Sequence, residues 1–207
     1  MSKTVLITRP YYDDTTHYLY HWSSLPIILA SKRKDIKIVQ LVEDKVNKKN
    51  FESITSKIAP SFIFMNGHGS DSVIAGHNSE YLVEVGVNEA VFDSRIIYAL
   101  SCSSGKLLGP ASIKAGARAY VGYDDVFVFY TDLASVSKAM FLEPSNTVVN
   151  ALLKGHTVSD AHNRSQKEFM KNIQTLLTMS SDTYLVPWLL WDMRHQVCLG
   201  DKTSALQ

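Results

Sequence analysis

Two side chains in this sequence could together carry out nucleophilic chemistry, the thiol of Cys102 and the imidazole of His68. A cysteine attacks a carbonyl carbon as its thiolate, so it needs a base or an environment that lowers its pKa from about 8.5. An imidazole, with an intrinsic pKa of about 6.5, can take that proton and later give it to a leaving amine. We therefore interpret His68 and Cys102 as the general base and the nucleophile of an acyl transfer through a thioester.

Each of these side chains follows a run of apolar residues that is typical of a buried parallel strand. Residues 62–65 lead into His68, and residues 96–100 lead into Cys102. Parallel sheets expose reactive groups at the carboxyl ends of their strands. If both strands lie in one sheet, the thiol and the imidazole face each other across its edge.

Backbone groups beside this pair could stabilise the oxyanion of a tetrahedral intermediate. Gly69 lets a substrate approach closely, and its N–H together with that of Cys102 forms our predicted oxyanion hole. Gly105 lets the chain turn into a helix that we expect to begin near Lys106. The dipole at the N-terminus of that helix would favour a thiolate.

The composition indicates one globular domain over residues 1–207. The chain has 207 residues and is 45% hydrophobic, which is enough for one substantial core. Its 21 Lys and Arg nearly balance its 20 Asp and Glu, and no basic run is longer than residues 32–34. A nucleic-acid-binding surface normally clusters more positive charge, so we expect no nucleic-acid partner.

The cysteine count argues against a disulfide framework or a structural zinc site. The only cysteines are Cys102 and Cys198, and neither belongs to a CxxC pattern. The sequence also contains no HExxH motif, so we expect no metal and no cofactor. Cys198 lies in an apolar run and is interpreted as a buried, inert thiol. The apolar stretch at the N-terminus is too short for a signal peptide, and no later stretch is long enough to span a membrane. We expect a cytoplasmic protein with no membrane partner.

Strands and helices are predicted to alternate along the chain. We expect strands over residues 3–8, 36–42, 62–65, 96–100, 119–122, 126–130 and 196–199. We expect helical segments over residues 17–30, with a break near Pro26, and over residues 51–58, 106–116, 134–141, 148–154 and 158–177. A hairpin over residues 72–83 is expected to turn at residues 76–78. This alternation predicts an α/β fold with a mostly parallel central sheet and helices on both faces.

Two motifs resemble those of the caspase-like superfamily of cysteine peptidases (clan CD), which includes caspases, gingipains, clostripain, separase and CHAT domains. Asn66-Gly67-His68-Gly69 is similar to the histidine motif, and residues 99–105 are similar to the cysteine motif. The compact spacing between the motifs is closest to CHAT and gingipain-like domains. Residues 115–123, 151–161, 187–188 and 199–201 also resemble segments of those domains.

The resemblance implies a caspase-like three-layer sandwich and a cysteine endopeptidase that cleaves a protein or peptide substrate with a His68/Cys102 dyad. It also implies that a regulatory protein or sensor partner controls the activity. Two specificity signatures of the superfamily are absent. The caspase Gln-Ala-Cys sequence does not occur, and Leu100 stands where clostripain-like and separase-like members often place an aspartate. Asp124 and Asp125 could line a substrate pocket instead, or could be an ordinary solvated pair.

Other interpretations remain open at this point. His77, on the expected hairpin tip, is the main rival to His68 as the base, and Asn66 could either orient His68 or cap a turn. The chain could also be a catalytically inactive caspase-like binding or scaffold domain. An inert Cys102 that iodoacetamide alkylates only slowly at neutral pH would favour this second class.

Overall fold

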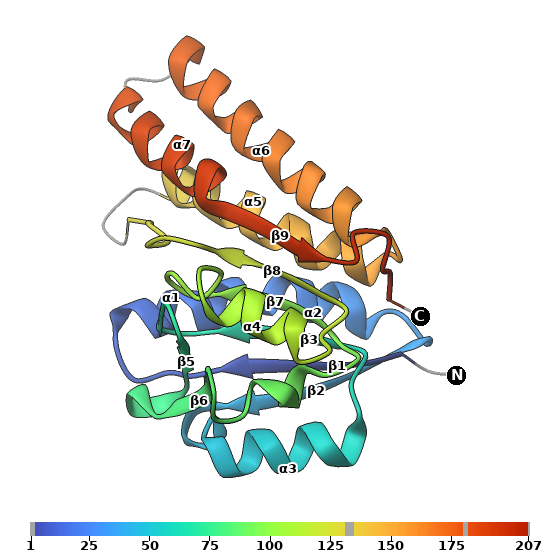
Figure 1. Ribbon diagram of the computed structural model, residues 1–207. Coiled ribbons are helices and arrows are strands. Elements are labelled where there is room, and N and C mark those ends of the chain that lie inside the picture. Colours follow the sequence, from blue (N-terminus) through green and yellow to red (C-terminus); the bar gives the residue numbers. More distant parts are fainter. Residues whose placement is uncertain (1–2, 131–134, 180–181, 207) are drawn as a thin grey trace.

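The fold is built on a six-stranded sheet, seen in the computed structural model of Figure 1, which describes residues 3–130, 135–179 and 182–206. The strand order is β2-β1-β3-β7-β8-β9. These strands are β1 Lys3–Arg9, β2 Ile36–Val42, β3 Phe62–Asn66, β7 Ile96–Leu100, β8 Ala119–Tyr123 and β9 Gln196–Gly200. All neighbouring pairs are parallel except β8 and β9, which are antiparallel.

The central strands are apolar throughout because both faces of the sheet are covered. Every residue of β3, β7 and β8 is buried, and alternate residues point into two separate cores. Phe64 and Tyr98 face one core, where their rings stack at 5.2 Å, while Met65 and Ala99 face the other. Because both faces of the sheet carry buried apolar side chains, helices must cover both faces.

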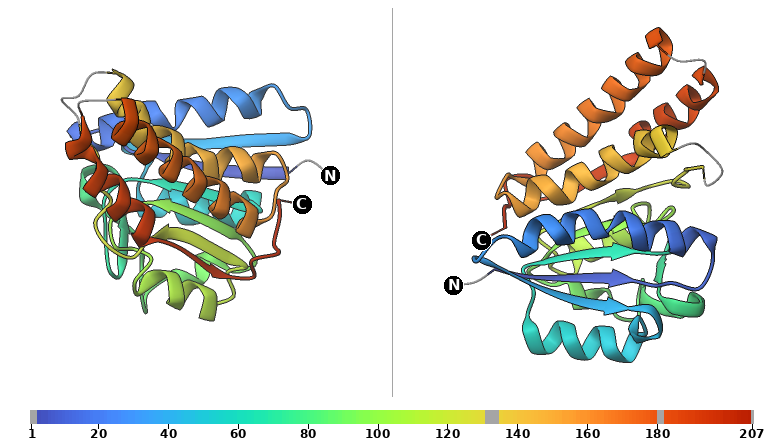
Figure 2. Two further views of the ribbon diagram at one scale, coloured as in Figure 1. Left: turned by 90° about the horizontal axis from the view of Figure 1, so that it is seen from above. Right: turned by 180° about the vertical axis from the view of Figure 1, so that it is seen from behind.

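Helices cover both faces, as the two views of Figure 2 show. One core includes residues from α1 Asp14–Trp22, α2 Ser24–Ser31, α5 Ser135–Leu153, α6 Val158–Met179 and α7 Val186–His195. The other core includes residues from α3 Lys48–Ile58 and α4 Leu108–Lys114. Short 3₁₀ turns lie at Glu43–Lys45, His77–Ser79, Glu89–Phe92 and Thr183–Leu185. The predicted α/β fold, a three-layer sandwich with a mostly parallel sheet, is confirmed.

A small antiparallel sheet joins β3 to β7. It consists of β4 Gly69–Ser70, β5 Val73–Ala75 and β6 Tyr81–Glu84. The hairpin predicted over residues 72–83 corresponds to β5 and β6, and its turn contains Asn78 at a φ of +52°. Strand β4 was not predicted, and it begins directly after His68.

Three further segments differ from the sequence prediction. Residues 126–130 are not a strand, because β7 and β9 already occupy both sides of β8. The helices expected over 134–141 and 148–154 form the single helix α5, although the expected start at Ala134 lies outside the described residues. Helix α7 was not predicted, and its Trp188 and Trp191 are 39% and 38% exposed.

Helix α5 continues through Pro144 because another side chain takes over the hydrogen bond that proline cannot make. A proline has no N–H to donate to the carbonyl four residues earlier, here that of Met140. The side chain of Asn172 on α6 donates to this carbonyl at 2.9 Å. Among the described residues, no helix is both long and apolar enough to cross a membrane.

Candidate active site

Three parallel strands bring a carboxylate, an imidazole and a thiol to one edge of the sheet. Strands β1, β3 and β7 are neighbours, and the register pairs Thr8 with Met65 and Asn66 with Leu100. Each strand is followed within a few residues by a polar side chain, Asp13 after β1, His68 after β3 and Cys102 after β7. The structure thus brings His68 and Cys102 to a common cavity and adds Asp13, which the sequence interpretation missed.

Asp13 holds the imidazole of His68. The distance between His68 Nε2 and Asp13 Oδ2 is 2.7 Å, and both side chains are 38% exposed. The ring of Tyr12 packs edge-on against His68 at a centroid distance of 6.1 Å. Because Asp13 engages Nε2, Nδ1 is the ring nitrogen left to exchange a proton with a thiol.

The carboxylate of Asp13 is fixed by the start of helix α1. As the N-cap residue, it accepts hydrogen bonds from the Thr16 N–H at 2.8 Å and from the Thr16 hydroxyl at 2.7 Å. Partial burial alone would raise the pKa of Asp13, but the bonds from Thr16 and from His68 outweigh it and lower the pKa. Asp13 is therefore ionised at neutral pH and can stabilise an imidazolium at His68.

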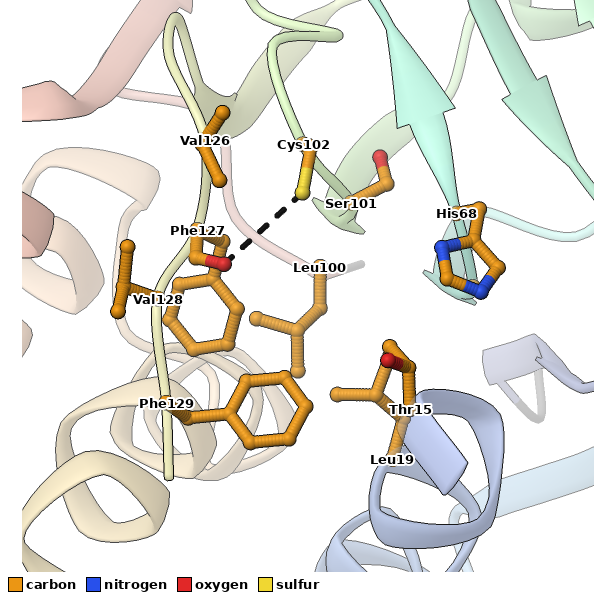
Figure 3. Close-up of a pocket in the computed structure, with 11 residues that line it drawn as sticks. Thr15, Leu19, His68, Leu100, Ser101, Cys102, Val126, Phe127, Val128 and Phe129 are labelled. Carbon is orange, nitrogen blue, oxygen red and sulfur yellow. Dashed lines mark hydrogen bonds between the residues drawn. The ribbon is translucent and has the colours of Figure 1, made fainter. Parts of the chain in front are cut away.

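The Cys102 thiol is half-buried and directed toward the backbone of the loop after β8. Its Sγ lies 3.9 Å from the carbonyl oxygen of Phe127, the contact drawn in Figure 3. Burial raises the pKa of the Cys102 thiol, and the carboxylate of Asp192 adds to this effect. Within the described residues, no hydrogen bond joins Cys102 to His68. This arrangement holds the thiol in its protonated form.

The turn after Cys102 depends on close backbone packing. Ser103 has a φ of +57°, and its N–H donates to the carbonyl of Asp125 at 2.9 Å. A Cβ on Gly105 would lie 2.6 Å from the side chain of Val197, so only glycine fits there. The following helix begins at Leu108 rather than near Lys106, and it is only seven residues long. Its N-terminus is therefore separated from Cys102 by the turn.

Gly69 lies against the backbone of the residues that carry the thiol. A Cβ on Gly69 would be 2.7 Å from the carbonyl oxygen of Cys102. The Ala75 N–H donates to the His68 carbonyl, which makes Gly69 and Ile74 a non-hydrogen-bonded pair of β4 and β5. In such a pair the N–H of Gly69 points away from β5. The oxyanion role of Gly69 and Cys102 stays a prediction.

The two acidic residues proposed for a substrate pocket interact elsewhere. The Asp124 carboxylate lies 2.8 Å from His195 Nδ1, and Asp125 accepts a hydrogen bond from the Val126 N–H at 2.7 Å. Neither is among the residues that line the cavity beside Cys102. A pocket role for Asp124 and Asp125 is thus without support from this geometry.

The rival sequence candidates are also accounted for by their contacts. The ring of His77 packs on Tyr12 at 5.2 Å and does not line the cavity. The Asn66 side chain donates to the Thr8 carbonyl at 2.9 Å and so ties β3 to β1. Cys198 is half-buried against the larger core. Among the described residues, no group of three or more His, Cys, Asp or Glu could hold a metal ion.

A cavity of about 340 Å³ lies between the thiol and the imidazole, and we call it the thiol cavity. It is lined by Thr15 and Leu19 of α1, by residues 67–68 and 100–102 at the ends of β3 and β7, and by residues 126–129. Figure 3 shows Cys102 and His68 at its border and Phe129 and Leu19 at the opposite end. Cys102 and His68 therefore border one cavity that a side chain or a small ligand could enter.

Comparison with solved structures identifies the fold. The chain is similar to RgpB of Porphyromonas gingivalis, solved as a complex of its pro- and mature domains, with a TM-score of 0.67 and 11% sequence identity. The match covers 99% of this chain and 48% of that chain, so this chain spans about half its length. The fold is therefore the caspase-like α/β fold that the sequence resemblance implies.

A second solved structure is similar over much of the chain. It is a secreted C11 cysteine protease of Bacteroides thetaiotaomicron, "iotapain", with a TM-score of 0.46 and 12% identity, covering 84% of this chain and 70% of that chain. No protein-family profile matches the sequence. No curated protein matches it either.

Proposed function

We propose that this chain is a cysteine peptidase that cleaves a protein or peptide substrate with Cys102 as nucleophile and His68 as general base. The observation that carries the proposal is the contact between the Asp13 carboxylate and the His68 imidazole, 2.7 Å long, at the border of the cavity that Cys102 also lines. A nucleophile, a base and a group that orients the base are the parts that such a reaction needs. Asp13 is a positioning residue in this scheme.

The reaction proceeds in two acyl transfers. His68 Nδ1 takes the thiol proton, the thiolate of Cys102 forms a bond to the substrate carbonyl carbon, and the carbonyl oxygen becomes an oxyanion. The oxyanion then reforms the carbonyl as the C–N bond breaks, and the imidazolium gives its proton to the leaving amine. Water next attacks the thioester, losing a proton to His68, and the C–S bond breaks to release the acid and the thiol. The N–H groups of Gly69 and Cys102 stabilise both oxyanions.

We further propose that a regulatory protein or sensor partner controls this site. Support comes from the contacts that hold residues 126–129 near the thiol. The Trp191 Nε1–H donates to the Val126 carbonyl at 2.9 Å, and the Val128 N–H donates to Asp192 at 2.9 Å. A partner that binds the exposed aromatic side chains of α7 would move this loop, release Sγ from Phe127 and let Cys102 turn toward His68. A cytoplasmic location remains a prediction.

One observation favours the alternative that the chain is an inactive caspase-like binding or scaffold domain. Burial raises the pKa of Cys102, and Sγ contacts the Phe127 carbonyl rather than the imidazole. Slow alkylation by iodoacetamide, no faster than for Cys198, together with no cleavage of any peptide in the presence of cell extract, would establish this alternative.

The test is cleavage of a peptide library by the wild type, with and without cell extract from the source organism. We expect Cys102→Ala and His68→Ala to lose cleavage, and Cys198→Ala, the matched thiol control, to keep it. Cleavage that persists in Cys102→Ala would exclude the proposed nucleophile. Mass spectrometry of the protein treated with a peptide electrophile then checks that the label is on Cys102.

A further inference from the structure

We propose that the thiol cavity selects substrates with a large apolar side chain, such as leucine, methionine or phenylalanine, at the residue whose carbonyl Cys102 attacks. This inference rests on the proposed peptidase function and adds the class of substrate. A large apolar side chain needs no acidic or basic group in its pocket, whereas peptidases that recognise a charged residue at the cleavage site do.

The inner surface of the cavity is apolar. Leu19, Leu100 and Phe127 are 2%, 1% and 6% exposed, and all three side chains belong to the larger core that they share with the central sheet. Phe129 lies beside them and packs on Phe127 at a centroid distance of 5.7 Å. A substrate side chain in the cavity would therefore extend the hydrophobic core of the protein itself.

The cavity offers no partner for a charged side chain beyond His68. Within the described residues, its lining contains no carboxylate, lysine or arginine, and its other polar side chains are the hydroxyls of Thr15 and Ser101 and the thiol. Three carboxylates near the cavity already have partners: Asp13 interacts with His68 and Thr16, Asp124 with His195, and Asp125 with the Val126 N–H. A lysine or arginine side chain would meet no carboxylate of the lining, and an aspartate or glutamate would meet no basic side chain there except His68. Burying an unpaired charge is strongly unfavourable.

The volume also fits one large side chain. At about 340 Å³, the cavity is at the lower end of the range of roughly 300–1,000 Å³ typical of small-ligand pockets. Each methylene of apolar contact in such a pocket is worth about 10- to 200-fold in specificity. We therefore expect leucine, methionine and phenylalanine to exceed alanine by at least about 10-fold in kcat/KM and to exceed arginine or aspartate by about 10²-fold or more.

The first experiment compares peptides that differ only in the residue before the scissile bond, with wild type and Cys102→Ala. Cleavage that depends on Cys102 and favours large apolar residues supports the proposal. Cleavage that depends on Cys102 but favours arginine, lysine or aspartate overturns the cavity proposal and leaves the peptidase function intact. Cleavage that persists in Cys102→Ala, or no cleavage with or without cell extract, overturns both.

The second experiment introduces a charge on the cavity wall. Thr15 lines the cavity, is only partly buried and lies in the first turn of α1, where an acidic residue is favourable. We expect Thr15→Asp to raise cleavage after arginine or lysine relative to leucine by at least about 10-fold. His17→Asp adds the same charge on the exposed side of that helix, outside the cavity, and keeps the wild-type preference.

The thermal midpoint of each variant shows whether it folds. If Thr15→Asp fails to fold, Phe129→Leu serves instead, since it widens the cavity and shifts preference from leucine toward tryptophan. A folded Thr15→Asp or Phe129→Leu protein with an unchanged preference shows that the substrate side chain binds elsewhere, and the proposal then fails.

Discussion

At the scale of single residues, Asp13 combines two functions in one carboxylate. Its Oδ1 accepts hydrogen bonds from Thr16 and so caps the start of helix α1, while its Oδ2 contacts His68. A helix start is more rigid than a free loop, so the cap also fixes the direction of the imidazole. Stability and proposed catalysis therefore depend on the same side chain but on different atoms of it, and substitutions can separate them.

Asp13→Asn is expected to lower kcat/KM by about 10²-fold, while it lowers the thermal midpoint only by the small amount that the lost carboxylate charge contributes. Asparagine still caps α1 through its side-chain oxygen, but it carries no charge to stabilise an imidazolium. Thr16→Val is the control, because it removes the hydroxyl bond to Asp13 without touching His68. It should lower the midpoint and change activity less. Equal activity of wild type and Asp13→Asn would rule out the positioning role.

The lowered pKa of Asp13 predicts how stability depends on pH. Because the folded-state pKa lies below the usual value of 3.8, the unfolded chain binds the proton more readily. The stabilisation from the Asp13 charge is thus present above about pH 4 and is lost as pH falls through the folded-state pKa. Denaturant unfolding of wild type and Asp13→Asn between pH 2 and 7 measures this. A difference between the two that grows toward low pH would contradict it.

The sequence predicted that two of these three residues, His68 and Cys102, lie at one sheet edge, because both follow apolar runs typical of buried parallel strands. Asp13 follows a strand as well, but the short polar segment 13–16 lies just after Pro10 and has the residue types of a turn. The available signal was the spacing of Asp13 and Thr16, which suits a capping interaction at the start of a helix. That pattern predicts a cap and cannot by itself predict the contact with His68, which depends on β1 and β3 being neighbours.

At the scale of secondary structure, Pro144 shows how a helix and its neighbour share one hydrogen bond. The Asn172 side chain, 3% exposed, donates to the Met140 carbonyl that Pro144 leaves without an N–H partner. The sequence interpretation places one helix before Pro144 and another after it, and propensity alone disfavours proline by about 3 kcal/mol in a helix interior. The compensating amide lies 32 residues away on α6.

A double-mutant cycle tests this compensation. We expect Asn172→Ala to cost about 1–3 kcal/mol in free energy of unfolding, because it leaves the partly buried Met140 carbonyl without a donor. In the Pro144→Ala background the cost should fall by at least half, since the substituted residue has a backbone N–H that can donate to the Met140 carbonyl. Urea denaturation of the four proteins gives the coupling. Strict additivity would show that Asn172 does not compensate for the proline.

Helix α7 contributes a buried carboxylate that opposes stability at neutral pH. Asp192 is fully buried, its Oδ1 accepts from the Val128 N–H, and its Oδ2 has no partner among the described residues. Burial raises the pKa of Asp192 well above its usual value of 3.8. The folded protein therefore binds this proton more readily, and stability falls as pH rises from about 4 toward the folded-state pKa.

Asp192→Asn removes that pH dependence and keeps an oxygen for the Val128 N–H. We expect the variant to match wild type near pH 4 and to exceed it by at least about 1 kcal/mol in unfolding free energy at pH 8. Urea denaturation across this pH range measures the difference. Asp124→Asn, which removes a partly exposed carboxylate from the loop that carries Val128, is the control. A variant that is less stable than wild type at pH 8 would contradict the burial argument.

At the scale of the whole molecule, the first and last segments of the chain belong to one core. Val5 of β1 and Leu206 near the end of the described chain are buried in the same cluster, and β9 pairs with β8 at the edge of the central sheet. The sequence predicted the alternating elements and the strand near residues 196–199. It did not predict that β9 runs antiparallel, because the connection through α5, α6 and α7 gives no local signal of direction.

The shared core predicts that the chain unfolds as one cooperative unit, in line with the single domain expected from composition. Trp22 reports on α1, whereas Trp188 and Trp191 report on α7. We expect Trp22→Phe and the double variant Trp188→Phe, Trp191→Phe each to show one fluorescence transition that coincides with its circular dichroism transition in urea. Two transitions, or a midpoint for α7 well below that for α1, would mean that the C-terminal helices form a separate unit. The rings of Trp22 and Phe129 pack at a centroid distance of 4.9 Å, and Trp191 Nε1–H donates to the Val126 carbonyl. Residues 126–129, which line the thiol cavity, therefore connect the reporters on α1 and α7. A separate C-terminal unit would divide the proposed site.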